Sequence, residues 1–427
     1  MPTTNPPAQL KRELGVFAAT FMGVGSIIGT GVFVSIGIAA GIAGAGVLIA
    51  LVIGAIVATC NGLNSAQLAA NHPVSGGTYE YGYRYLNPAW GFTAGWMFLV
   101  AKTASAATAA LGFAGYLVRI TGWDANLLIP IALITAIAMT FIVLNGIRRS
   151  HITNVVIVSI TLFSLCFFIL ACLTRGMAEG VNNLTPLLTA SGTNVLHASA
   201  LMFVAYTGYG RIATLGEEVR SPRKTIPQAM IFCLLLVMVL YMAVGAVGIA
   251  AVGVDVFNPV DSSARIASLE IVAQTVMGKG GALIVTVGAM TAMLGVLLNL
   301  ILGLSRVLLA MGRRGDAPRF LANLNQQQTT PYWAVFSVGT GICLLVLLGN
   351  VKTTWSFSAF SVLIYYGITN LAALQLTPST RLYPLWVTWF GLVSCFFLAF
   401  WVDSLVWQMG LGLIILGLIW HKIRQGR

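Results

Sequence analysis

Two short stretches of this sequence place glycine inside long apolar runs, where an uninterrupted helix would otherwise be expected. The first, from Gly25 to Phe33, reads GSIIGTGVF, and the second, from Phe203 to Gly210, reads FVAYTGYG. Glycine permits non-helical backbone, which frees amides and carbonyls that a helix keeps paired. At membrane depth such backbone is tolerated only where protein or a cavity covers it. The chemistry expected here is binding, because freed amides can hold a carboxylate and freed carbonyls can hold an ammonium group.

Each interruption contributes a set of candidate binding residues. Those of the first are Ile27, Gly29, Thr30 and Gly31, and those of the second are Phe203, Val204, Ala205, Tyr206, Thr207 and Gly208. In the second set, the carbonyls of Phe203, Val204 and Thr207 are the candidate partners of an ammonium group. Plainer explanations remain open: the glycines can serve close helix packing, and the aromatic side chains can be ordinary packing residues.

Lys102 is a charged residue near the middle of an otherwise apolar run, VAKTAS. It lies about 13 residues into its expected helix, or about 20 Å, which is too deep for easy snorkelling of its side chain. Ionisable residues at such depth are functional by default. Both a role in ion coupling and structural pairing with carbonyls stay open. We find no catalytic cluster and no metal-type spacing within the apolar runs, so we expect neither an enzyme nor a cofactor.

The elements that must position these residues are membrane-spanning helices. The chain of 427 residues is 58% hydrophobic and only 8% charged, whereas soluble domains average about 25% charged residues. A run of about 20 apolar residues spans a bilayer. We expect twelve spans, with outer loops at about 174–193 and 253–279: 15–40, 45–70, 89–118, 126–145, 152–173, 194–214, 228–252, 280–305, 331–349, 355–376, 384–402 and 405–421.

The basic net charge of +12 is explained by membrane topology rather than by a nucleic acid partner. With the N-terminus inside, 17 of the 23 Lys and Arg residues fall on the cytoplasmic side and 5 fall outside, while Lys102 stays within a span. The positive-inside rule therefore predicts that both termini are cytoplasmic. The expected location is the cell (inner or plasma) membrane, with the lipid bilayer as a partner.

The two interruptions fall in the first and the sixth span, which implies two five-helix units of opposite orientation, an inverted repeat. The expected organisation is a cytoplasmic tail (1–13), a first unit (14–173), a second unit (194–376), two additional helices (384–421) and a C-terminal tail (422–427). The fold class is thus an all-α polytopic membrane protein.

The motifs resemble those of the amino acid–polyamine–organocation permeases, closest to their cationic amino acid transporter branch. Besides the two interruptions, the stretches 73–79 (PVSGGTY), 222–227 (PRKTIP) and 305–311 (SRVLLAM) are similar to family patterns. The resemblance implies a leucine-transporter-like 5+5 fold with two added helices. It also implies an amino acid permease that works by alternating access as an exchanger, a facilitator or a secondary active transporter. A polyamine or organic-amine carrier is the alternative.

The resemblance also suggests roles for single residues. It implies that the amides of Thr30 and Gly31 hold the substrate carboxylate and that the Ile27 carbonyl faces the ammonium group. Thr161 stands where several proton-coupled relatives keep a lysine. Its hydroxyl can join a cation site or simply bond back to its own helix.

A cytoplasmic charge cluster follows the second interruption. Arg211, Glu217 and Glu218 are expected to order a gate, with a solvated loop as the plain alternative. Because no acidic residue lies within a span and Thr161 replaces the lysine, exchange or facilitation is favoured over proton coupling through Lys102. The coupling ion, proton or sodium, stays open.

Overall fold

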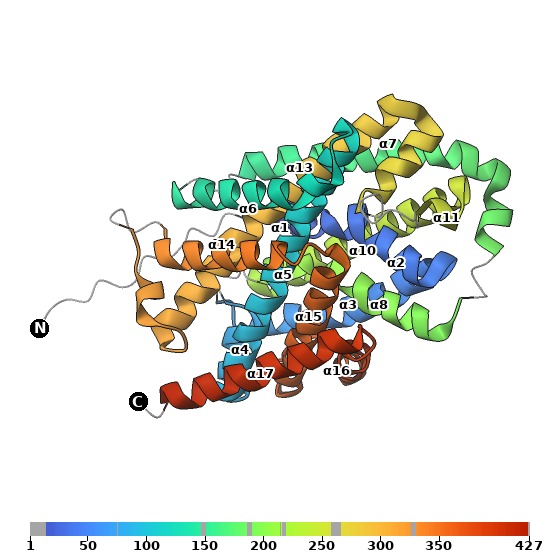
Figure 1. Ribbon diagram of the computed structural model, residues 1–427. Helices are drawn as coiled ribbons and strands as arrows, with labels where there is room; N and C mark the ends of the chain where they lie inside the picture. The colour runs from blue at the N-terminus through green and yellow to red at the C-terminus, as the bar shows by residue number, and fades with distance from the viewer. Residues whose placement is uncertain are drawn as a thin grey trace, which may run out of the picture.

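The computed structural model describes residues 14–425 apart from residue 75 and the stretches 147–150, 186–189, 214, 216–218, 258–265 and 326–329. In this part the chain forms a bundle of long helices (Figure 1). Its one extended pairing in the described part is a bridge between Leu14 and Val219. The helices are α1 (Val16–Ile27), α2 (Ile36–Ala43), α3 (Val47–Asn71), α4 (Thr78–Tyr85), α5 (Pro88–Thr121), α6 (Leu128–Leu144), α7 (His151–Leu184), α8 (Gly192–Tyr206), α9 (Gly210–Ala213), α10 (Pro222–Val252), α11 (Val254–Phe257), α13 (Ser268–Arg314), α14 (Tyr332–Val346), α15 (Val351–Leu374), α16 (Leu385–Ala399) and α17 (Ser404–Gln425).

The bundle has the composition of a membrane protein. Eight helical stretches of the described chain are long and apolar enough to cross a bilayer, and α14 and α16 are shorter apolar helices. Large apolar side chains, among them Ile134, Phe141, Phe163 and Leu170, point outward on α6 and α7. Lipid is the environment that suits such a surface. The chain is therefore an integral membrane protein, while the number of twelve crossings and the inverted repeat stay predictions.

Helix α5 runs through the middle of the bundle and packs against α13 and α15 (Figure 1). Its buried positions are mostly small, for example Ala101, Ala104, Ala107 and Ala110, and they have almost no exposed surface. Small residues let helices approach closely in a membrane, where apolar contact alone gives little driving force. The sequence of α5 thus brings Lys102 to the centre of the molecule.

Helices α3 and α10 frame the two interrupted segments: α3 packs against α8 and α10, and α10 packs against α1 and α7. On its other side α3 is fixed to α15 by neutral side chains. Asn370 accepts a hydrogen bond from Asn64 at 2.7 Å and donates one to Asn61 at 2.6 Å. Paired amides of this kind are stable at membrane depth, whereas an unpaired one would be costly.

Two predicted outer loops are largely helical instead. Helix α7 continues to Leu184, and α13 already begins at Ser268. Helix α13 is bent at Gly278, whose backbone angles (φ 68°, ψ −166°) are accessible to glycine and not to a β-branched residue. The polar residues that suggested loops lie on helices that extend beyond the apolar spans.

Candidate binding site

The first interruption is a true opening of the backbone. Helix α1 ends at Ile27, and Ile28 is extended (φ −74°, ψ 114°). The helix restarts through a π-helical turn, η1 (Gly31–Ser35), in which the amides of Val32 and Phe33 both reach the Gly29 carbonyl at 3.2 Å. Because the first amides of a helix have no partner within it, the restart leaves the amides of Thr30 and Gly31 available for a ligand.

The hydroxyl of Thr30 adds to this opening. The residue is 4% exposed, and its Oγ1 has no hydrogen-bond partner among the described residues. An unsatisfied buried hydroxyl is costly unless something bonds to it. The first interruption thus offers a hydroxyl and helix-start amides at one point.

The second interruption is milder than predicted. Helix α8 ends at Tyr206, a 3₁₀ turn (η5, Thr207–Tyr209) follows, and the short helix α9 begins at Gly210. Thr207 (φ −74°, ψ 0°) keeps its amide bonded to the Val204 carbonyl. The backbone tightens here rather than opening, because a 3₁₀ turn replaces i−4 bonds with i−3 bonds and leaves few groups without partners.

The two interruptions touch each other. A Cβ added at Gly208 would collide with the Ser26 carbonyl and would lie 2.6 Å from the Ile27 amide nitrogen. A Cβ at Gly31 would lie 2.9 Å from the Ala205 Cβ. These glycines therefore serve close contact between the two segments, as well as opening the first one.

Hydroxyl groups already occupy several of the carbonyls predicted to hold an ammonium group. The Tyr241 hydroxyl, from α10, lies 3.1 Å from the Ile27 carbonyl and 3.3 Å from that of Ala205. Tyr366, from α15, donates to the Thr207 carbonyl at 3.1 Å, and the Thr207 hydroxyl donates to that of Val204 at 2.9 Å. Each carbonyl keeps a second lone pair, so an ammonium group can still approach.

A small pocket lies where the interruptions meet. It has a volume of about 40 Å³. The predicted residues Ile27, Thr30, Gly31, Val204, Ala205, Thr207 and Gly208 line it, together with Ser26, Lys102, Ser105, Val296, Leu300 and Trp355. The other three predicted residues lie behind the wall: Gly29 faces Val296, Phe203 packs on Tyr366, and the Tyr206 hydroxyl reaches the Leu51 carbonyl.

A larger cavity of about 230 Å³ adjoins the small one. The two share Ser26, Lys102, Thr207, Gly208, Val296 and Leu300. The larger cavity extends to Tyr79 of α4 and to Arg211 and Arg306. Arg211, predicted as a gate residue, therefore lines the route to the small cavity, whereas Glu217 and Glu218 lie outside the described residues.

Lys102 stands between the two cavities. Its Nζ donates to the Thr207 hydroxyl at 3.1 Å, and that hydroxyl in turn donates a hydrogen bond to the Val204 carbonyl. The lysine is thus held by a side chain of the second interruption rather than by carbonyls alone. Thr161 lies elsewhere, on α7, and its hydroxyl bonds back to the Ile157 carbonyl of its own helix at 2.8 Å.

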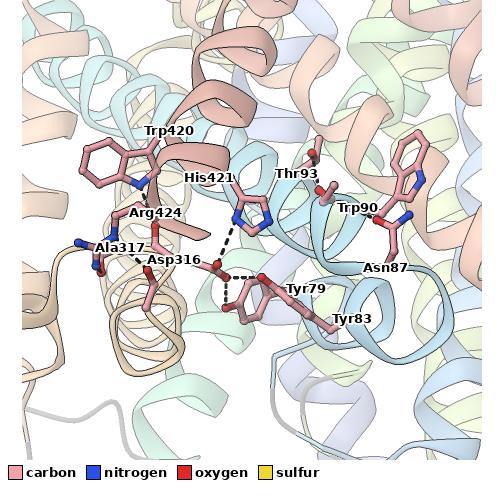
Figure 2. A network of polar contacts seen from close by, with 12 residues as sticks. Tyr79, Tyr83, Asn87, Trp90, Thr93, Asp316, Ala317, Trp420, His421 and Arg424 are labelled. Carbon is pink, nitrogen blue, oxygen red and sulfur yellow. Dashed lines mark hydrogen bonds and ion pairs between the residues drawn. The ribbon is translucent and has the colours of Figure 1, made fainter. Parts of the chain in front are cut away.

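A second polar cluster, centred on Asp316, was not predicted from the sequence (Figure 2). The hydroxyls of Tyr79 and Tyr83 donate to Asp316 Oδ2 at 2.6 and 2.7 Å, and His421 Nδ1 lies 3.3 Å from Oδ1. Burial first, and then the hydrogen bond to Asp316, raise the pKa of Tyr79 and of Tyr83 well above the ordinary value. Both phenols therefore remain proton donors.

The Asp316 cluster ties α4 and the end of α13 to α17. Because Tyr79 also lines the larger cavity, this cluster fixes one wall of the route to the small cavity. The i, i+4 spacing of Tyr79 and Tyr83 put them on one face of a helix and was a usable signal. The pairing of Asp316 with His421 across 105 residues left no such signal.

A bundle of apolar helices with an interior cavity between two interrupted helices is the architecture of a membrane transporter. A family model described as amino acid permease matches residues 18–423, and the chain belongs to this family. It is 38% identical over 402 residues to an uncharacterized transporter of Mycobacterium tuberculosis, covering 92% of this chain and 87% of that one.

Two further relatives carry more specific names. The serine/threonine exchanger SteT of Bacillus subtilis is 25% identical, with 87% of this chain and 85% of that one covered. The vacuolar cationic amino acid transporter 4 of Arabidopsis thaliana is also 25% identical, with 83% and 63% covered.

Proposed function

We propose that this permease binds the amino and carboxylate groups of an amino acid in the small cavity and carries it across the cell membrane by alternating access. The main observation behind the proposal is that both interruptions line one pocket together with the Thr30 hydroxyl, which has no hydrogen-bond partner among the described residues. The amides of Thr30 and Gly31 and that hydroxyl would hold the carboxylate. The carbonyls of Ile27, Val204 and Thr207, together with that of Phe203 behind the wall, are the candidates for the ammonium group.

The packing of the helices supports an inverted repeat. If α1, α3, α5, α6 and α7 correspond to α8–α9, α10, α13, α14 and α15, contacts should occur in exchanged pairs. The pair α5·α15 has its counterpart in α13·α7, α1·α10 in α8·α3, and α7·α10 in α15·α3. Such exchange is expected of two similar units of opposite orientation. Helices α16 and α17 have no counterparts in this scheme and correspond to the two additional helices of the predicted fold. We further propose that both termini are cytoplasmic.

For the mode of transport we propose exchange or facilitation without an ion gradient. The Thr161 hydroxyl is bonded to its own helix, and no ion pair of the described residues involves Lys102. Neither residue thus has the partner that a proton relay would need. The relative SteT, a serine/threonine exchanger, supports this mode. Proton coupling through Lys102 is the second candidate.

Uptake by proteoliposomes tests the mode. Exchange predicts uptake of labelled amino acid that is stimulated several-fold by unlabelled amino acid inside and is indifferent to pH and sodium gradients. Accumulation driven by a proton gradient in the parent, and lost in Lys102→Met, would instead identify Lys102 as the coupling residue. Exchange by a Thr161→Val variant at the parent rate would confirm that this hydroxyl serves its own helix.

A polyamine carrier is the weaker alternative. Polyamines carry no carboxylate, so the amides and hydroxyl of the first interruption would have nothing to bind. Acidic residues that would hold several amines are missing from the described linings of both cavities.

A further inference from the structure

The charged residues that line the two connected cavities in the described part of the chain are all positive. Lys102 borders both cavities, and Arg211 and Arg306 line the larger one. No aspartate or glutamate contributes to either lining among the residues that the structure describes. Of these three residues, Lys102 is the one that borders both the site and the route.

The carboxylates of the described chain that form ion pairs do so elsewhere. Glu80 pairs with Arg314, Glu270 with Arg119 and Asp403 with Lys352, while Asp316 lies 3.3 Å from His421. Lys102 reaches a neutral partner, the Thr207 hydroxyl. A hydroxyl satisfies one of its three donors and leaves its charge uncompensated.

The size of the small cavity decides where a substrate side chain must go. A space of about 40 Å³ holds roughly three water molecules, since one needs about 10–15 Å³ on the same measure. That is room for the amino and carboxylate groups of an amino acid and little else. On the far side Gly31 and Ala205 are in close contact. A side chain must therefore extend past Lys102 into the larger cavity.

We infer that the site accepts amino acids with neutral or anionic side chains and rejects those with cationic side chains, and that Lys102 is the residue that sets this preference. The inference rests on the proposed function, because it assumes that an amino acid binds in the small cavity. Like charges a few ångströms apart repel strongly where water is scarce. The preference separates this chain from its cationic amino acid relatives and also disfavours polyamines.

Matched pairs of ligands that differ mainly in charge test the inference. Lysine is compared with norleucine, arginine with citrulline, and glutamate with glutamine, each as a competitor of uptake by purified protein in proteoliposomes. We expect the neutral member of each cationic pair to compete at least about tenfold better, and glutamate to compete at least as well as glutamine. Equal competition within the cationic pairs would overturn the inference.

Two variants assign the preference to Lys102. Lys102→Met should bring lysine and norleucine within about threefold of each other, whereas Lys102→Arg should keep the tenfold gap. An unchanged gap in Lys102→Met would refute the role of this residue. If Lys102→Met does not fold, as judged by gel filtration, the ligand pairs on the parent and on Lys102→Arg still decide the charge preference.

Failure of the proposed function gives a different result. In that case no amino acid of any charge competes, and no member of any pair raises the melting temperature of the parent. If only the charge inference fails, neutral amino acids still compete for uptake, and cationic amino acids compete equally well.

Discussion

Both interruptions place glycines within an apolar run, but their structures differ. At the first, an extended Ile28 separates α1 from a π-helical restart, and the Thr30 hydroxyl has no partner among the described residues. At the second, a 3₁₀ turn keeps the chain nearly helical, and hydroxyls of Thr207, Tyr241 and Tyr366 cover its carbonyls. The backbone of the first interruption is open at Ile28, whereas the second keeps the Thr207 amide bonded to the Val204 carbonyl. Glycine content alone does not distinguish the two, because the backbone conformation does.

The largest expected effect comes from the contact between the interruptions. Gly208→Ala puts a methyl group against the backbone of Ser26 and Ile27, which cannot move aside as a flexible side chain would. We expect a loss of about 2 kcal/mol or more in unfolding free energy, with loss of transport. Gly303→Ala is the control, because nothing lies within 4 Å of its Cβ position. Equal thermal stability of the two variants would show that the interruptions are not in contact.

A smaller effect is expected at the hydroxyl that joins the interruptions. Tyr241→Phe leaves the buried carbonyls of Ile27 and Ala205 without this donor, at a cost of about 1–3 kcal/mol. Tyr206→Phe is the control, since it removes one longer bond, at 3.3 Å, to Leu51. In thermal unfolding in detergent, Tyr241→Phe should lower the melting temperature more than Tyr206→Phe does. A larger loss in Tyr206→Phe would show that the Tyr241 hydroxyl does not link the two segments.

The hydroxyl of the open interruption should matter for binding and not for stability. Thr30→Val removes a buried hydroxyl that has no partner in the described protein, so we expect a melting temperature equal to or above that of the parent. Substrate affinity should fall about three- to tenfold, the value of one hydrogen bond. Thr161→Val, whose hydroxyl is bonded to its own helix, should leave affinity within about twofold. A Thr30→Val variant that binds like the parent would contradict our assignment of the carboxylate.

The smallest effect concerns the Asp316 cluster, away from both interruptions. The pKa of Tyr79 and of Tyr83 is raised in the folded protein from an ordinary value of 10.0. Their contribution to stability is therefore fully present below pH 10 and is lost as the pH rises above it. These two tyrosines should not change the melting temperature between about pH 6 and 9. Above pH 10 the melting temperature should fall, and it should fall less steeply in Tyr83→Phe. A parent and variant with the same slope would contradict this.

The sequence predicted the membrane class and the positions of both interruptions, because long apolar runs and glycine within them depend on local composition. It did not predict the hydrogen bonds from Tyr241 and Tyr366 to carbonyls of the second interruption, because these tyrosines come from helices further along the chain. It likewise predicted loops where α7 and α13 continue, because polar residues are as common on exposed helices as in loops. Asp316 follows the end of α13 and His421 lies on α17, so the two meet only in the folded chain, which no spacing reveals.

The most direct test of a site built for both charges of an amino acid compares free amino acids with their methyl esters. A ligand that binds only the folded protein raises its melting temperature, so thermal unfolding of the purified parent is followed with each member of the pair. We predict that at least one neutral amino acid raises the melting temperature by several degrees at saturation, and that its methyl ester does not. An ester that stabilises the protein as well as the free amino acid would contradict the account.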